Sequence, residues 1–184
     1  MSVKASKDIK EIDEQTWKEL KFITFTNIKS ILNSVKVLLK DNIIQNQEFL
    51  FDHPHICAGL YTYAIEEYGK LLILESYVSI NNKVKIEYLS KFTDHDAKFN
   101  IAIERLSLVA PECIRIGKGL FDPAFFDPAI FDTKESITSF KARLAIFYSD
   151  FKDNKIIVLP NVDKETLNKA VSEFEKIINH RRLK

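Results

Sequence analysis

The chain has 184 residues, of which 46% are hydrophobic and 29% are charged, and its formal net charge is +1. These values predict one domain, residues 1–184, with a sizeable core. The near-neutral charge argues against a strongly basic nucleic-acid platform, so any RNA contact must be confined to a local positive cleft. Cys57 and Cys113 lack CxxC spacing and favour a reduced protein over a disulfide or zinc scaffold. No apolar run reaches membrane-spanning length, and the expected location is the cytoplasm.

The first two predicted elements are long helices. From Trp17 to about Asp41, apolar residues repeat at three and four positions, which predicts an amphipathic helix. A second helix is expected from about His55 to Ile80, with Pro54 near its start and the pair Asn81-Asn82 as its stop. This second helix is apolar nearly all round, so we expect it to lie at the centre of the fold.

The later elements are also predicted to be helical. A short helix is expected over Lys83 to Leu89, and Thr93 or Asp94 can cap another that continues to about Val109, before Pro111. Thr133 or Ser136 begins a helix to about Ser149, and the last helix follows Asn161 or Asp163. Its apolar stripe comprises Leu167, Ala170, Val171, Phe174, Ile177 and Ile178. The apolar run 156–159 is too short to change an all-α prediction, and an extended segment packed on the bundle is its alternative interpretation.

Residues Gly117 to Asp132 have an unusual composition. Phe-Asp pairs recur there at a spacing of five, two of them followed by proline, which favours a chain of turns over a helix. We therefore predict a long insertion loop rich in Phe, Asp and Pro. Its phenylalanines either fold back onto the bundle or form a docking surface for a protein partner or a flap over a cleft.

Three predicted helices bring charged side chains into apolar surroundings. In the stretch YAIEEYGK, Glu66 and Lys70 are four residues apart in the orientation that favours an intrahelical ion pair, and Glu67 lies on the other side of the helix. On the next helix, His95 shares a face with apolar residues and is expected to point inward, whereas Lys98 lies along an edge. Charges are retained in such places mainly when partners or chemistry require them.

The third polar segment is KARLAIFYSDF, which carries Arg143, Tyr148 and Asp150. Arg143 lines up with apolar residues on the side that should face the protein, and a buried arginine needs an acid or a phosphate. Simpler interpretations are a structural ion pair between Arg143 and Asp150 and a core role for His95. The close pair His53 and His55 lacks the further ligands of a metal site, so no metal is expected.

These three segments resemble the AbiV-type branch of the HEPN superfamily, whose recurrent marks are Glu-Glu-x-Gly-Lys, His-x-x-Lys and an Arg followed by Leu/Ala, Tyr and Asp. The resemblance covers roughly residues 15 to 183. It implies a helical bundle that commonly dimerises and, in many members, a metal-independent endoribonuclease without a cofactor. The residues that match the motifs are Glu66, Glu67, Lys70, His95, Lys98, Arg143, Tyr148 and Asp150.

The resemblance implies a phage-defence toxin of abortive infection that cleaves RNA by attack of the ribose 2′-hydroxyl. Most HEPN ribonucleases carry a histidine shortly after the arginine on one helix, and no histidine follows Arg143 on its segment. A composite site is therefore expected, in which His95 is the acid/base group and Arg143 and Lys98 hold the phosphate. Glu66 or Glu67 would orient His95 or Lys98, or position the 2′-hydroxyl. The remaining motif residues, with an RNA-binding or orienting role, are Lys70, Tyr148 and Asp150. Expected partners are RNA, a second copy of the chain, and a phage-encoded activator or other regulatory protein. The alternative is a non-catalytic HEPN module that binds RNA, a nucleotide or a partner protein.

Overall fold

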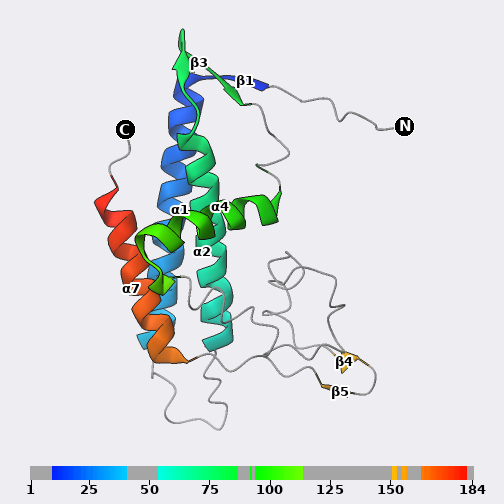
Figure 1. The fold of residues 1–184 in the computed structure, drawn as a ribbon, viewed down its shortest axis with the longest axis vertical. Coiled ribbons are helices and arrows are strands. Elements are labelled where there is room, and N and C mark those ends of the chain that lie inside the picture. Colours follow the sequence, from blue (N-terminus) through cyan, green and yellow to red (C-terminus); the bar gives the residue numbers. More distant parts are fainter. Residues whose placement is uncertain are drawn as a thin grey trace.

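The computed structural model is mostly helical, with a small sheet at one end of the helices (Figure 1). It describes residues 10–40, 54–86, 92, 94–113, 151–152, 155–156 and 163–181. The predictions for the loop 117–132, for the helix from Thr133 or Ser136, and for Arg143, Tyr148 and Asp150 lie outside these residues. The helices are α1 (Glu14–Lys40), α2 (Pro54–Glu75), α4 (His95–Val109) and α7 (Lys164–His180).

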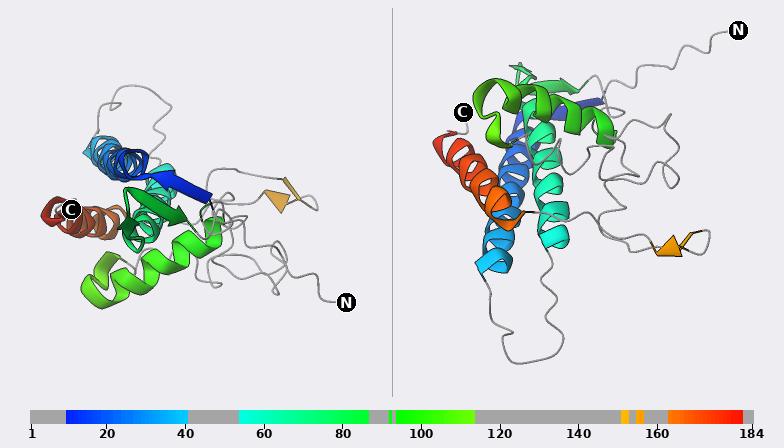
Figure 2. Two further views of the ribbon diagram at one scale, coloured as in Figure 1. Left: turned by 90° about the horizontal axis from the view of Figure 1, so that it is seen from above. Right: turned by 60° about the horizontal axis from the view of Figure 1, so that its bottom comes forward.

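Helices α1 and α2 lie side by side and run in opposite directions, and α7 packs beside them (Figure 1). Helix α4 crosses α2 at a steep angle, as the further views also show (Figure 2). The predicted central position of α2 is therefore confirmed, since α1, α4 and α7 all contact it. None of the described helices combines the length and the apolar character needed to cross a bilayer.

The main core forms where the four described helices meet. Tyr61 and Tyr68 of α2 are buried and both make edge-to-face contacts with Phe174 of α7, at ring-centroid distances of 6.0 and 5.3 Å. Such aromatic pairs add to the hydrophobic gain from burial. The apolar stripe predicted for the last helix is confirmed, because it supplies Leu167, Ala170, Val171, Phe174 and Ile178 to the core, with Ile177 packed against it.

The segment after α2 differs from the prediction. Instead of a helix to Ile80 and another from Lys83, the chain forms the strands β2 (Ser79–Ile80) and β3 (Lys83–Ile86), and β3 pairs with β1 (Lys10–Asp13). The three strands form an antiparallel sheet in the order β1-β3-β2. The all-α prediction is therefore too strict, although the fold is mostly helical.

The turn between β2 and β3 explains this correction. Asn81 and Asn82 have φ values of 53° and 60°, which is the left-handed pair that a two-residue hairpin turn requires and that asparagine tolerates. The sequence that follows alternates exposed and buried residues, with Val84 and Ile86 facing inward. These two residues join Trp17 and others in a second apolar cluster, so burial of alternate side chains outweighs helix propensity here.

Two predicted helix starts are confirmed. The side chain of Asp94 accepts hydrogen bonds from the backbone N–H groups of Asp96 and Ala97, and that of Asp163 accepts them from Glu165 and Thr166. An aspartate at this position satisfies N–H groups that have no partner within the helix. The first residue of α4 is therefore fixed at His95, directly after the cap.

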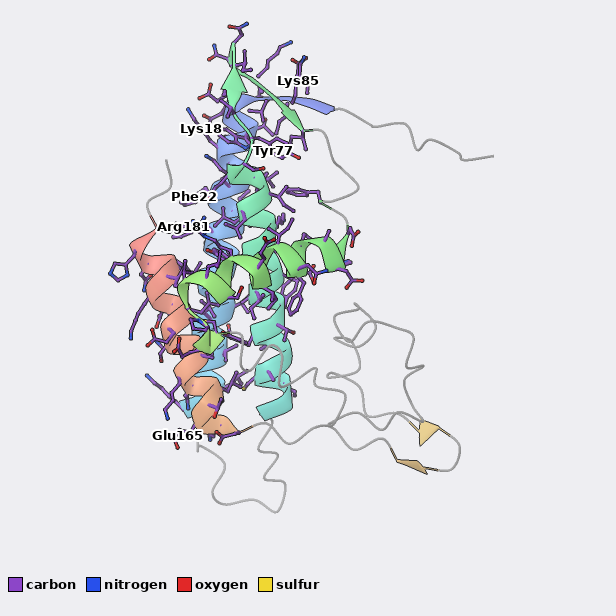
Figure 3. The ribbon with its side chains drawn as sticks, in the orientation of Figure 1. Lys18, Phe22, Tyr77, Lys85, Glu165 and Arg181 are labelled. Carbon is purple, nitrogen blue, oxygen red and sulfur yellow. The ribbon has the colours of Figure 1, made fainter. Side chains whose placement is uncertain are left out.

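The two ends of α7 are marked by Glu165 and Arg181 (Figure 3). Arg181 follows the last turn of α7 and pairs with Glu75 at 2.5 Å, while its guanidinium lies 4.9 Å from the centre of the Tyr68 ring. On α1, Lys36 pairs with Glu175 at 2.6 Å. Helix α7 is thus fastened by charged contacts to both α1 and α2.

The strands β4 (Phe151–Lys152) and β5 (Lys155–Ile156) form a short antiparallel pair. Ile156, the first residue of the apolar run for which an extended segment is the alternative interpretation, lies in β5. Cys57 and Cys113 are both buried, and neither forms a disulfide within the described residues.

Candidate functional site

The first two polar motifs meet where α4 crosses α2. The meeting point is Gly69 of the Glu-Glu-x-Gly-Lys motif, which lies against the backbone of Lys98. A Cβ atom built on Gly69 would lie 1.8 Å from the carbonyl oxygen of Lys98 and 2.6 Å from its carbonyl carbon. Every residue other than glycine would therefore force the two helices apart. The glycine in this motif permits a close crossing of α2 and α4, which brings His95 and Lys98 near the acidic residues of α2.

Glu66 is the centre of the resulting cluster. Its side chain is only 4% exposed, and its Oε1 atom lies 2.9 Å from the ammonium nitrogen of Lys98 and 2.6 Å from Nδ1 of His95. A buried carboxylate is costly unless cations and hydrogen bonds surround it, and here one oxygen has two such partners. The sequence-based grouping of Glu66, His95 and Lys98 is thus matched by direct contact.

His95 does not point into the core as its helical wheel predicted. Its side chain is 41% exposed, because His95 is the first residue of α4 and lies at the rim of the crossing. A carboxylate can only accept, so the Nδ1–H of His95 donates to Glu66. In the neutral ring, Nε2 is then the basic nitrogen, and the orientation of the imidazole is set by a buried acid.

Lys98 also differs from its prediction. The wheel placed it along an edge of α4, yet its side chain is only 7% exposed. The reason is the crossing angle, which brings the Lys98 position into contact with α2 at Gly69. Its ammonium is engaged by Glu66, so Lys98 holds the carboxylate in place and is poorly disposed to bind a phosphate directly.

The predicted intrahelical pair between Glu66 and Lys70 is also corrected. Lys70 instead pairs with Glu67, at 3.7 Å, and its ammonium lies 5.3 Å from the centre of the Phe92 ring. Glu66 points toward α4, whereas Glu67, one residue later, points to a different side of α2. The two neighbouring acids therefore have separate surroundings and separate chemical roles.

A histidine held by a buried carboxylate is an arrangement suited to proton transfer. The carboxylate fixes the tautomer and stabilises the imidazolium that forms when Nε2 takes a proton. Within the described part of the chain, no three His, Cys, Asp or Glu side chains gather into a metal-binding group. The third predicted motif, with Arg143, Tyr148 and Asp150, lies outside the described residues, so the composite site with His95 stays a prediction.

Comparison with family models, curated proteins and solved structures found no match to this chain.

Sequence reasoning did not assign two residues that the geometry brings into focus. Gly69 belongs to the first motif, and a glycine inside a run of good helix formers indicates close helix packing. Tyr63 begins the same stretch and is 47% exposed, one turn before Glu67. An exposed aromatic ring beside buried acids indicates a position that can contact a ligand. A helical wheel does not show this, because it gives the direction of a side chain and not its exposure.

Proposed function

We propose that this chain is a HEPN-type helical bundle of the AbiV branch, with residues 117–132 as an insertion loop, and that it acts in phage defence as a metal-independent endoribonuclease. The observation that carries the proposal is the exposed imidazole of His95, held at 2.6 Å by the buried Glu66, which is itself held by Lys98. A purely structural ion pair between Glu66 and Lys98 would not need a rim histidine.

The reaction in this proposal begins when Nε2 of His95 takes the proton from a ribose 2′-hydroxyl. The 2′-oxygen forms a bond to the adjacent phosphorus, the bond from phosphorus to the 5′-oxygen breaks, and the imidazolium returns its proton to that leaving oxygen. The products are a 2′,3′-cyclic phosphate and a 5′-hydroxyl. Glu66 orients the ring, and Lys98 positions Glu66.

Charge that builds on the phosphoryl oxygens needs a cation that is not already engaged. In this proposal that role belongs to Arg143, because a guanidinium binds phosphate through two parallel hydrogen bonds. Tyr148 and Asp150 of the same motif would contact the RNA or orient the arginine. This division of roles differs from the sequence prediction, in which Lys98 shared the phosphate.

The proposed assembly is a homodimer. Support comes from four large apolar side chains of α1 that are each about half exposed or more, namely Phe22, Ile23, Val37 and Leu38 (Figure 3 labels Phe22). An unrestrained ribonuclease would harm its own cell, so the proposal includes control by a phage-encoded activator or another regulatory protein, acting in the cytoplasm. Light scattering that shows a monomer at micromolar concentration would contradict the dimer.

The test uses total RNA incubated with the protein in EDTA, followed by analysis of the new RNA ends. We expect cyclic phosphate and 5′-hydroxyl ends, and His95→Ala should reduce cleavage by about a hundredfold or more while RNA binding is nearly unchanged. His180→Ala is the matched control, because His180 is an exposed histidine on α7 that contacts its own helix. A folded His95→Ala protein with full cleavage activity would disprove the catalytic role.

A non-catalytic HEPN module that binds RNA, a nucleotide or a partner protein is the second candidate. The observation that favours it is the burial of Lys98, whose engagement by Glu66 leaves the described part of the site with fewer groups for transition-state charge. The same assay separates the two, because a binding module would retain RNA without generating new ends.

A further inference from the structure

Glu67 is a buried acid, and one of its two carboxylate oxygens is left unsatisfied within the described structure. Its side chain is 6% exposed, and its Oε2 atom has no hydrogen-bond partner among the described residues. The nearest cation, the Lys70 ammonium, lies 3.7 Å away, which is longer than a hydrogen bond. Buried carboxylates are normally satisfied, so an orphaned oxygen beside a candidate active site indicates a ligand that supplies the missing donors.

Tyr63 lies next to this acid. It precedes Glu67 by four residues, which places both side chains on the same face of α2. Partial burial and the neighbouring carboxylates of Glu67 and Glu66 raise the pKa of Tyr63, so its phenol stays neutral at physiological pH. The ring is 47% exposed. It therefore offers an accessible flat surface within one helical turn of the orphaned carboxylate.

An aromatic surface next to a carboxylate matches the way in which proteins read unpaired bases. Bases in single strands stack on aromatic rings and are identified by hydrogen bonds to their Watson–Crick edges. Guanine alone presents two adjacent donors on that edge, N1–H and the 2-amino group, which fit the two oxygens of one carboxylate. Adenine and cytosine offer an amino donor beside an acceptor, and uracil offers a single imino donor between two carbonyls.

We propose that Tyr63 and Glu67 form a subsite for a guanine base, with the base stacked on the Tyr63 ring and both of its donors directed to the Glu67 carboxylate. This inference rests on the proposed function, because the guanine would belong to the nucleotide that flanks the phosphate presented to His95. It adds base specificity to a site whose other groups contact ribose and phosphate alone.

In this proposal, the Lys70 side chain moves away from Glu67 when the base binds. Its ammonium is only a distant counter-ion of Glu67 and rests over the Phe92 ring on a flexible stem that is 20% exposed. In this proposal, two hydrogen bonds from guanine replace the long contact between Lys70 and Glu67.

The test measures binding separately from cleavage. The probes are GMP, IMP and AMP, together with short 2′-O-methyl RNA strands that contain either one guanine or adenine in its place, since a 2′-O-methyl group prevents self-cleavage. We expect guanine to be preferred over adenine by about tenfold or more, with IMP intermediate because it lacks the 2-amino group. Glu67→Gln should abolish the preference, whereas Glu104→Gln, which removes an exposed acid on α4, should retain it.

Tyr63 gives a second set of variants that do not depend on the buried position. Tyr63→Phe should bind guanine as the wild type does, and Tyr63→Ser should weaken binding of all bases. Equal binding of GMP and AMP by the wild-type protein would overturn the inference, as would a guanine preference that survives in folded Glu67→Gln. If Glu67→Gln fails to fold, the relative affinities of the wild-type protein for GMP, IMP and AMP still test the inference.

The two proposals fail in different ways. Guanine-selective binding without any RNA cleavage would support this subsite and contradict the proposed ribonuclease activity. Comparison of the RNA strands with the mononucleotides would then show whether the guanine belongs to RNA or to a free nucleotide. Cleavage without any base preference, together with equal binding of the mononucleotides, would support the ribonuclease and overturn the subsite.

Discussion

Replacing Gly69 with alanine tests whether the close crossing of α2 and α4 builds the site. The new Cβ would lie 1.8 Å from the carbonyl oxygen of Lys98, whereas ordinary contact begins at about 3.4 Å. The helices must therefore separate by about 1.6 Å at this point. Since His95 has a short side chain, its 2.6 Å contact with Glu66 should stretch beyond hydrogen-bonding distance.

Two opposing effects set the sign of the stability change. Alanine in place of glycine inside a helix gains roughly 1 kcal/mol from helix propensity. Overpacking against a backbone that cannot rotate away costs about 1–3 kcal/mol, and strain on the buried pair of Glu66 and Lys98 adds to this cost. We therefore expect Gly69→Ala to be destabilising by roughly 2 kcal/mol, or about 4–8 °C in melting temperature for a domain of this size.

The assay is thermal and urea unfolding of Gly69→Ala beside Asn100→Ala. Asn100 is exposed on α4, so its replacement gains helix propensity without touching the crossing. We expect the control to be as stable as the wild type or more so. If Gly69→Ala were also stabilised, with the His95 imidazole unchanged in NMR spectra, the crossing would not depend on glycine and the reasoning would be refuted.

Three further predictions concern other parts of the fold. Glu66→Ala should destabilise the protein by about 3–5 kcal/mol because it leaves the buried Lys98 ammonium without its carboxylate, and Glu66→Leu combined with Lys98→Met should restore much of that loss in urea unfolding. Asn82→Gly should preserve the melting temperature, whereas Asn82→Val should lower stability by about 1–2 kcal/mol, because φ is 60° there. Burial raises the pKa of the Cys113 thiol to about 11. The folded state then retains a proton that the unfolded state loses, so stability should fall as the pH rises from roughly 9 to 11, and Cys113→Ala should flatten this slope in denaturation midpoints.

The sequence predicted the long helices well because their signals are local. Asp94 and Asp163 cap helices whose apolar residues repeat at helical spacing, and each is one of the two residues predicted for its helix start. The hairpin was missed because the pair Asn81-Asn82 was interpreted as a helix stop. Asparagine also adopts positive φ, and the alternation in KVKI that follows is the period of a strand.

The residues of the cluster around Glu66 could be named from the sequence, but their contacts could not. A helical wheel gives the direction of a side chain relative to its own helix, and the partner of Glu66 depends on where α4 crosses α2. The wheel therefore paired Glu66 with Lys70 on the same helix, whereas the crossing at Gly69 gives it His95 and Lys98. Burial of Lys98 has the same origin and could not be derived from the periodicity of α4.

The way in which α7 closes the core has a consequence for the order of folding. Helices α1 and α2 follow each other along the chain, whereas the hydroxyl of Tyr61 reaches the carbonyl of Ala170 across a separation of 109 residues. Contacts between distant residues carry a larger loop-closure cost and tend to form after local ones. We therefore expect the α1–α2 pair to be structured in the folding transition state and α7 to dock afterwards. Leu32→Ala would then slow refolding, whereas Phe174→Leu would mainly accelerate unfolding, and stopped-flow measurements with both variants would show it.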